Sequence, residues 1–257
     1  MQLNKKFSII LNSRGRIELL HNLLKSIVKT TSNLNDIEVL ISIDNDDEIT
    51  IKMLHGLVAL SLVDISWLYW ETIPRNRNLQ NRLNNLANSA HGKYIFVLND
   101  DCEILTKLWD FHIYDLLEEY NDSEISNRNL NTSGGIIYGA TQCNSADHGP
   151  EPYSSFPIIS KKAVDALGCF MPDEVPGLGG DVLAYRIYNE IGARIETPLQ
   201  IRHVLHETIE SVINPDQTAA EMRQFSRTNS MDFWNLDISK YTNKLKEYID
   251  GHSICKH

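Results

Sequence analysis

Two adjacent aspartates follow a short apolar run in the middle of the chain. The run Tyr94–Leu98 leads directly into Asn99, Asp100 and Asp101. An uninterrupted apolar run of this length is typical of a strand buried on both faces of a sheet, so the carboxylates after it lie at the edge where open α/β folds bind ligands. Neighbouring carboxylates favour a divalent cation carrying a diphosphate, because Mg²⁺ and Mn²⁺ prefer carboxylate and phosphate oxygens. The alternative is a solvated acidic turn.

A second acidic cluster follows an earlier apolar run. The residues Ile37–Ile43 are typical of another buried strand, and the acidic stretch Asp44–Glu48 comes directly after it. A carboxylate at this strand end can accept hydrogen bonds from uracil N3–H or from a ribose hydroxyl, which favours Asp44 as a binding residue and Asp46 as a second one. The alternative is that Asp44 or Asp46 caps the helix expected from about residue 48.

Two arginines lie in the loop after the first expected strand, residues 7–12. Arg14 and Arg16 flank Gly15, and a glycine lets the backbone approach a ligand closely. A guanidinium group can stack on a base or form a forked contact with phosphate, so both arginines are candidates for holding a nucleotide. The alternative is a surface salt bridge. Three further arginines are each expected on a solvated face, although one of them could neutralise a diphosphate: Arg75, Arg77 and Arg82.

Strands and helices alternate through the first 98 residues. Short apolar runs alternate with stretches of helical periodicity, which predicts strands over 7–12, 37–43, 65–70 and 94–98 and helices over 17–30, 48–60 and 79–91. This order predicts a mostly parallel sheet with right-handed crossovers, in which both acidic clusters lie at the same rim. The less regular second half is expected to hold strands over 136–141 and 198–204 and helices over 109–120, 161–167, 181–191 and about 231–249.

Composition narrows the class of protein. The 257 residues are 42% hydrophobic, which is ample for a core, and the net charge of −10 argues against a nucleic-acid surface. No apolar run approaches the ~20 residues of a membrane span, and the chain enters a strand-like segment near its start, so no signal peptide is expected. The four cysteines lack metal-ligand spacing and are expected to be free thiols in a cytoplasmic protein.

The ordered set of motifs resembles the nucleotide-diphospho-sugar transferases of the GT-A fold, and most closely the family 2-type glycosyltransferases of phages and bacteria. The resemblance covers roughly residues 6–210 and includes later motifs at 156–160, 164–168, Asp181, Ile191–Gly192, Pro198 and His206. It implies a Rossmann-like, mostly parallel central sheet flanked by helices. The expected organisation is a single GT-A domain over 1–210, with a helical extension over 211–257 packed on that domain.

The resemblance also implies roles for the residues that follow the central strands. Asp101 corresponds to the last carboxylate of the Asp-x-Asp motif, which binds Mn²⁺ or Mg²⁺ between the sugar-nucleotide phosphates, and Asp100 belongs to the donor-binding set. Asn99 replaces the first aspartate and can hydrogen-bond a ribose hydroxyl. His206 is expected to complete the metal site, with His203 as the second choice; the alternative is that both histidines are structural.

Asp181 opens a predicted helix directly after two glycines. The resemblance makes it the general base that deprotonates the acceptor hydroxyl. The alternative is a helix N-cap, a role that aspartate fills well. The two roles are compatible, because a fixed helix start is a rigid place for a base.

These residues predict a metal-dependent glycosyltransferase. It would transfer a hexose-type sugar from a nucleoside diphosphate, expected to be UDP, to a hydroxyl of a glycan or other acceptor with inversion. The alternatives are a nucleotidyltransferase that makes a sugar nucleotide, or a binding protein that has lost catalysis on the same fold. No nucleic-acid partner and no membrane span are expected, and self-association as a homo-oligomer is compatible with the sequence.

Overall fold

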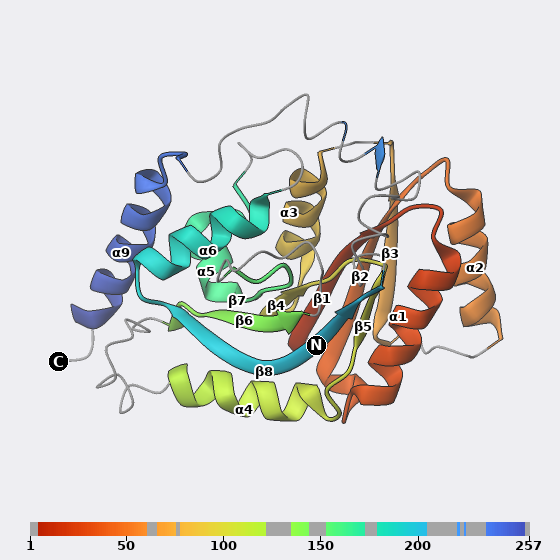
Figure 1. Ribbon diagram of the computed structural model, residues 1–257, viewed down its shortest axis with the longest axis horizontal. Helices are drawn as coiled ribbons and strands as arrows, with labels where there is room; N and C mark the ends of the chain where they lie inside the picture. The colour runs from red at the N-terminus through yellow and green to blue at the C-terminus, as the bar shows by residue number, and fades with distance from the viewer. Residues whose placement is uncertain are drawn as a thin grey trace.

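A mixed eight-stranded sheet forms the centre of the structure, with helices on both faces (Figure 1). The computed structural model describes residues 5–60, 66–75, 78–121, 135–143, 153–172, 179–204, 220–221, 224 and 235–254. Within these residues the strand order is β3-β2-β1-β4-β7-β6-β8-β5. None of the helices in the described part of the chain is both long and apolar enough to cross a membrane.

The first half of the chain forms the parallel part of the sheet. Its elements are β1 (Lys5–Ser13), α1 (Ile17–Thr30), a 3-10 turn (Leu34–Asp36), β2 (Ile37–Asp44), α2 (Glu48–Ala59), β3 (Leu68–Ile73), α3 (Leu79–Ser89) and β4 (Gly92–Val97). All eight residues of β2 are buried, which explains why its sequence is mostly apolar, with Glu38, Ser42 and Asp44 as the polar exceptions. β1 pairs in parallel with both β2 and β4, and β2 with β3.

The second half closes the other side of the sheet. Its elements are β5 (Cys102–Ile104), α4 (Trp109–Asn121), β6 (Tyr138–Cys143), β7 (Ile158–Ser160), α5 (Lys161–Leu167), α6 (Gly180–Glu190), β8 (Arg194–His203) and α9 (Ser239–Ile254). β7 is antiparallel to both β4 and β6, whereas β6 and β8 are parallel, and β5 forms the edge antiparallel to β8. The predicted fold class, a mostly parallel α/β sheet of GT-A type flanked by helices, is confirmed.

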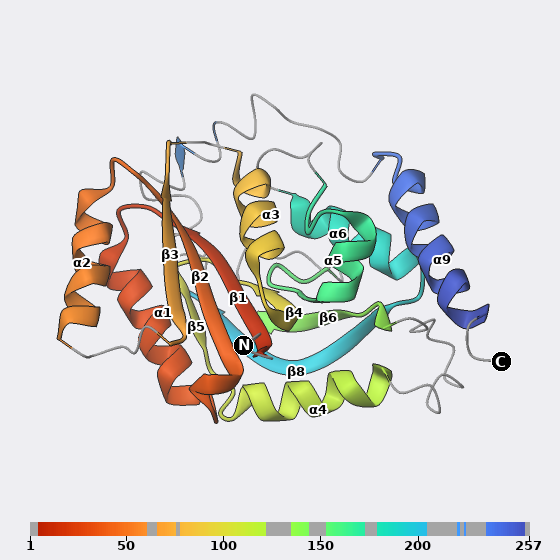
Figure 2. The ribbon, with the colours of Figure 1, turned by 180° about the vertical axis from the view of Figure 1, so that it is seen from behind.

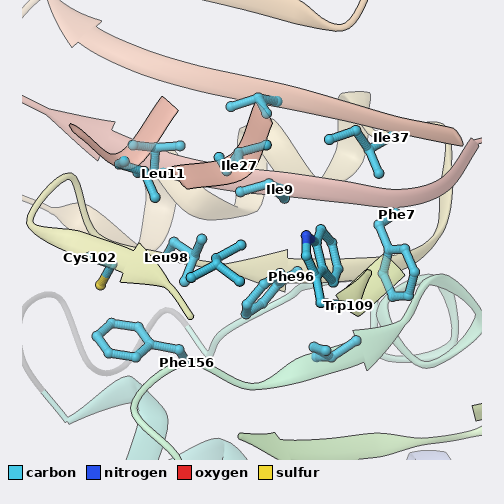
Figure 3. Packing of buried hydrophobic residues seen from close by; sticks show 14 of the residues in the cluster. Phe7, Ile9, Leu11, Ile27, Ile37, Phe96, Leu98, Cys102, Trp109 and Phe156 are labelled. Carbon is cyan, nitrogen blue, oxygen red and sulfur yellow. The ribbon is translucent and has the colours of Figure 1, made fainter. Parts of the chain in front are cut away.

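Two hydrophobic clusters fill the layers on either side of the sheet. Alternate β1 side chains divide between them: Ile9 and Leu11 face one cluster, with α1 and α4, and Ile10 faces the other, with α3, α5 and α6. Figures 1 and 2 show α4 on the side of the sheet opposite α5 and α6, and Figure 3 shows Ile9, Phe96 and Trp109 packed in the first cluster. The amphipathic helices therefore bury one stripe each against a shared sheet.

The last helix packs on the second cluster. Three of its residues, Tyr241, Leu245 and Ile249, belong to that cluster, and Lys244 Nζ donates a hydrogen bond of 2.6 Å to the carbonyl of Leu167 at the end of α5. The predicted helix over 231–249 is therefore observed over 239–254, displaced toward the C-terminus. A division of the chain near residue 210 stays a prediction.

Candidate active site

The carboxyl ends of β1, β2 and β4 meet at one rim of the sheet. Ser13 is in register with Ile43, so the loop after β1 lies beside Asp44 at the end of β2. On the other side Ile10 is in register with Val97, and Leu98 N donates to the Ile10 carbonyl at 3.1 Å. The residues that follow β4 therefore lie beside the same loop, as the parallel order predicts.

Asp44 is held by two guanidinium groups from separate elements. Its carboxylate is buried; Oδ1 accepts a hydrogen bond from Arg82 Nη1 at 2.7 Å and Oδ2 one from Arg14 Nη1 at 2.9 Å. Arg82 Nε also donates to Ser42 Oγ at 3.2 Å. Burial lowers the pKa of Arg82, and Asp44 opposes that shift. The expectation that Arg82 lies on a solvated face is wrong: its side chain is 4% exposed, and its charge is compensated inside the fold.

Asp46 and Asp47 fix the loop that carries Arg14. Both guanidinium Nη atoms of Arg14 donate to exposed Asp46, and these hydrogen bonds lower the pKa of that carboxyl. Asp47 accepts from Gly15 N at 2.8 Å and also caps α2 by accepting from Thr50 N. The capping alternative for Asp44 and Asp46 is therefore wrong, because Asp47 is the N-cap.

Asp100 and Asp101 share a second guanidinium group. Arg16 Nη1 lies 3.0 Å from Asp100 Oδ1 and 3.6 Å from Asp101 Oδ2. Ser13 Oγ donates to the other Asp100 oxygen at 2.8 Å. Burial raises the pKa of Asp100 to about 6, although Arg16 opposes the shift; the charge of Asp101 adds to it. The arginine side chain is only 13% exposed, so a surface salt bridge does not describe it.

Asp101 also meets the end of β8. Its Oδ1 lies 3.2 Å from His203 Nε2, and the buried Cys102 is the antiparallel partner of His203. Ligand atoms of all three residues lie within 4.8 Å of one another. Two cis ligands on an ion with bonds of about 2.1 Å are about 3 Å apart, so the Asp101–His203 separation fits a shared divalent cation.

The thiol beside this pair was not foreseen. Cys102 has no other cysteine at metal-ligand spacing in the sequence, and only the pairing of β5 with β8 brings it to His203. Burial raises the pKa of the Cys102 thiol. Figure 3 shows Cys102 and Phe156 in the first hydrophobic cluster, and the Phe156 ring packs edge-on against the His203 imidazole at a centroid distance of 5.0 Å.

Asp181 lies in the first turn of α6. Gly179 is the N-cap with φ +100°, Gly180 is the first helical residue, and Asp181 Oδ1 accepts from Val182 N at 2.9 Å. The capping alternative is therefore wrong, although a carboxylate in the first turn still interacts favourably with the helix dipole. Asp181 is half-buried, so one side of it faces solvent.

Of the remaining residues predicted from the sequence, the structure describes Asn99 but not His206. Asn99 is exposed beyond β4, with its backbone carbonyl accepting from Cys102 N at 3.2 Å. His206 lies outside the described residues. One residue that sequence reasoning missed is Asn12, next to Ser42 in register: its Oδ1 is buried and has no hydrogen-bond partner within the described part of the chain.

The family follows from comparison with known proteins. The family model for glycosyl transferase family 2 matches residues 8–164. The chain therefore belongs to glycosyl transferase family 2 and is a glycosyltransferase. No curated protein matches it by sequence.

Solved structures with the same GT-A fold include three glycosyltransferases. Residues 1–349 of S. aureus TarS share 13% identity at a TM-score of 0.57, over 96% of this chain and 81% of that one. The mannosyltransferase PcManGT from Pyrobaculum calidifontis, in complex with GDP-Man and Mn²⁺, shares 9% at 0.57, over 99% and 76%. GalNAc-T7 with UDP, GalNAc and Mn²⁺ shares 12% at 0.59, over 96% and 55%. This chain spans 43% of the longer S. aureus TarS structure. At these identities the likeness shows the fold alone.

Proposed function

We propose that this glycosyltransferase is metal-dependent and transfers a sugar from a nucleoside diphosphate to an acceptor hydroxyl with inversion. One observation carries the proposal: neighbouring arginines of a single loop connect two buried carboxylate clusters at the same rim. Arg14 holds Asp44, and Arg16 holds Asp100 and Asp101. A site with oriented carboxylates and guanidinium groups suits a ligand that has both N–H or O–H donors and phosphate oxygens.

The nucleoside would bind beside the ends of β1 and β2. Asp44 is already oriented by Arg14 and Arg82, so it can accept from a base N–H or a ribose hydroxyl without losing rotamer freedom on binding. Asn12 Oδ1 offers a buried acceptor at the same end of β1. We assign Asp46 and Asn99, which are exposed at the rim, to the edge of this subsite.

The metal and diphosphate would bind at the end of β4. Asp101 and His203 would hold a Mn²⁺ or Mg²⁺ ion, with His206 as a further ligand. The ion would supply positive charge against the charge that develops on the leaving diphosphate. Arg16 lies beside the same carboxylates and can turn its charge toward the phosphates when an ion compensates Asp101.

Asp181 would act as the general base. The acceptor hydroxyl oxygen forms a bond to the anomeric carbon while the bond from that carbon to the phosphate oxygen breaks, and Asp181 takes the hydroxyl proton. The nucleoside diphosphate leaves with the bonding electrons. A single displacement of this kind inverts the anomeric configuration. A positioned base contributes about 10²–10⁴-fold to such a step.

The donor nucleotide is best sought among those bound by proteins of the same fold. The related structures include TarS with UDP and with UDP-GlcNAc, and PcManGT with GDP-Man. We therefore favour UDP and place GDP second. A cytoplasmic location and self-association stay predictions.

Calorimetry with UDP and with GDP, in Mn²⁺ and in EDTA, tests the proposal, followed by a turnover assay with UDP-GlcNAc and GDP-Man. One nucleotide should bind at least tenfold more tightly with Mn²⁺, and Asp101→Ala should remove that difference. Asp165→Ala is the control, because Asp165 is exposed on α5 and pairs with Lys161. Equal affinity in Mn²⁺ and EDTA would contradict metal dependence, and binding without turnover would favour the non-catalytic alternative.

A further inference from the structure

Helix α3 stands between the residues assigned to donor binding and the residue assigned as base. Figures 1 and 2, seen from opposite sides, both show α3 beside α6. On one side of α3, Arg82 reaches Asp44 at 2.7 Å. Gln80 and Asn84 are four residues apart and lie on the same side of the helix. Arg82 is two residues from each of them and points in a different direction. The same helix thus contacts the donor carboxylate and a second region of the fold.

Asn84 ties α3 to the segment that follows α5. Its Oδ1 accepts from Phe170 N at 2.8 Å and from Met171 N at 2.9 Å, and its Nδ2 donates to the Met171 carbonyl at 2.8 Å. Asn84 is 8% exposed, so these bonds are made in the interior, where leaving any of them unmade is costly. This segment is therefore held in a fixed position relative to α3.

Gln80 makes the contact closest to the proposed base. Its side chain is buried, and its carboxamide occupies the space that a side chain at residue 180 would enter. A Cβ added at Gly180 would lie 2.8 Å from both Gln80 Nε2 and Oε1 and 2.9 Å from its Cδ. Real Cβ atoms do not approach that closely, so a side chain at residue 180 would force either the buried Gln80 carboxamide or α6 itself to shift. Asp181 is the next residue.

We infer that Gln80 and Gly180 are positioning residues that set the distance between the base and the donor. The inference rests on the proposed function, because it needs Asp181 as the base. Arg82 fixes α3 relative to Asp44, and the Gln80–Gly180 contact fixes the first turn of α6 relative to α3. A displacement of about 1 Å at a reacting group can lower a rate by about a hundredfold, so this contact controls turnover without touching the nucleotide.

Gly180→Ala tests the contact. The added methyl group should push α6 away from α3, lowering kcat about tenfold or more, while the donor KM and the affinity for UDP with Mn²⁺ stay within about threefold. Turnover is measured as the release of nucleoside diphosphate from UDP-GlcNAc or GDP-Man, whichever the enzyme uses as donor. Gly56→Ala in α2 is the matched control, because a Cβ added there meets nothing within 4 Å. The control should keep its kcat.

A double variant distinguishes a positioning role from a general loss of stability. Gln80→Ala alone leaves α6 without its support and should lower kcat, whereas Gln80→Ala combined with Gly180→Ala should raise kcat at least threefold above Gly180→Ala alone. Strictly additive losses, or a Gly180→Ala variant as active as Gly56→Ala, would overturn the inference. If Gly180→Ala does not fold, Gln80→Ala decides: an unchanged kcat overturns it.

The reference variant Asp181→Asn separates this inference from the proposed function. An active Asp181→Asn variant would remove the base assignment itself. An inactive Asp181→Asn variant beside a fully active Gly180→Ala variant would overturn only the role of Gln80 and Gly180.

Discussion

The guanidinium group of Arg16 compensates two neighbouring buried carboxylates at once. Its Nη1 atom lies 3.0 Å from Asp100 and 3.6 Å from Asp101. Arg16 is therefore the positive charge nearest to both aspartates, and without it a divalent ion would have to take that role. Arginine and metal are therefore expected to share the work of compensating the two aspartates.

Arg16→Gln should destabilise the protein by about 3 kcal/mol in EDTA, because it leaves buried carboxylates without their cation. Mn²⁺ should recover part of this loss, so the metal-dependent increase in melting temperature should be larger than in the wild type. Thermal unfolding with and without Mn²⁺ measures both effects. Arg202→Gln serves as the control, since its pair with Glu103 is more exposed and worth at most about 1 kcal/mol. The same Mn²⁺ shift in the wild type and in Arg16→Gln would contradict shared compensation.

Asp100 should make the protein less stable as the pH rises. Burial raises its pKa from the ordinary value of 3.8 to about 6 in the fold, so the folded state binds this proton more tightly than the unfolded state. The stabilisation is fully present below pH 3.8 and is lost as the pH rises through about 6, a change of about 3 kcal/mol. Urea unfolding of the wild type and Asp100→Asn between pH 4 and pH 7 measures it. The wild type should lose stability relative to the variant; parallel curves would show that the carboxyl is not shifted.

Arg82 and Asp44 should behave as one unit. Arg82→Met and Asp44→Asn should each cost about 3 kcal/mol of stability, because each leaves a buried partner without its counter-charge. The double variant should lose less than the sum by about 1–3 kcal/mol. Arg82→Lys should not restore nucleotide affinity, because an ammonium group cannot contact Asp44 and Ser42 as the guanidinium does. Denaturant unfolding and UDP calorimetry of the wild type and these four variants decide; additive losses would mean that the pair is not coupled.

Asp181→Asn should keep the fold and nucleotide binding but lose turnover by at least about a hundredfold. The amide oxygen can still accept from Val182 N, so the first turn of α6 is preserved. Circular dichroism, UDP calorimetry and single-turnover rates are compared with the wild type. Normal turnover would leave Asp181 only its interaction with the helix start, and weak UDP binding would place it in the donor site.

Cys102→Ser should change which metal binds rather than whether one binds. A thiolate favours Zn²⁺ over Mn²⁺, and the sulfur lies within 4.8 Å of the ligand atoms of Asp101 and His203. The variant should lose about tenfold in Zn²⁺ affinity and keep its Mn²⁺ affinity, as measured by calorimetry. Cys169→Ser is the control, because Cys169 packs against the second hydrophobic cluster, whereas Cys102 belongs to the first. Unchanged Zn²⁺ affinity would show that the thiol belongs to the hydrophobic core alone.

The strands that carry the site were predictable because each is a local pattern. β1, β2 and β4 are mostly apolar runs followed by polar residues, and their order places Asp44 and Asp100 at one rim. β5 and β7 were missed, because three-residue strands carry no periodic signal and depend on pairing with β8 and β4, which lie far away in the sequence.

The contacts of single polar residues were less predictable. Arg82 was expected in solvent, because nothing near it in the sequence shows that Asp44, 38 residues away, would compensate its charge. The family resemblance favoured His206, which stays a prediction because it lies outside the described residues; that His203 reaches Asp101 depends on the register of β8 with β5. Gly180 and Gln80 are 100 positions apart, and their contact depends on how two helices pack.

The contacts of α3 also limit how this enzyme can be recombined with its relatives. A chimera that joins residues 5–75 of this chain to the remainder of another family 2 enzyme would separate Asp44 from its own Arg82. A junction after residue 121 would instead separate Gln80 and Asn84 from Gly180 and Met171. Chimeras made to exchange acceptor specificity should therefore be active only when α3 and the residues that it contacts on both sides come from one parent.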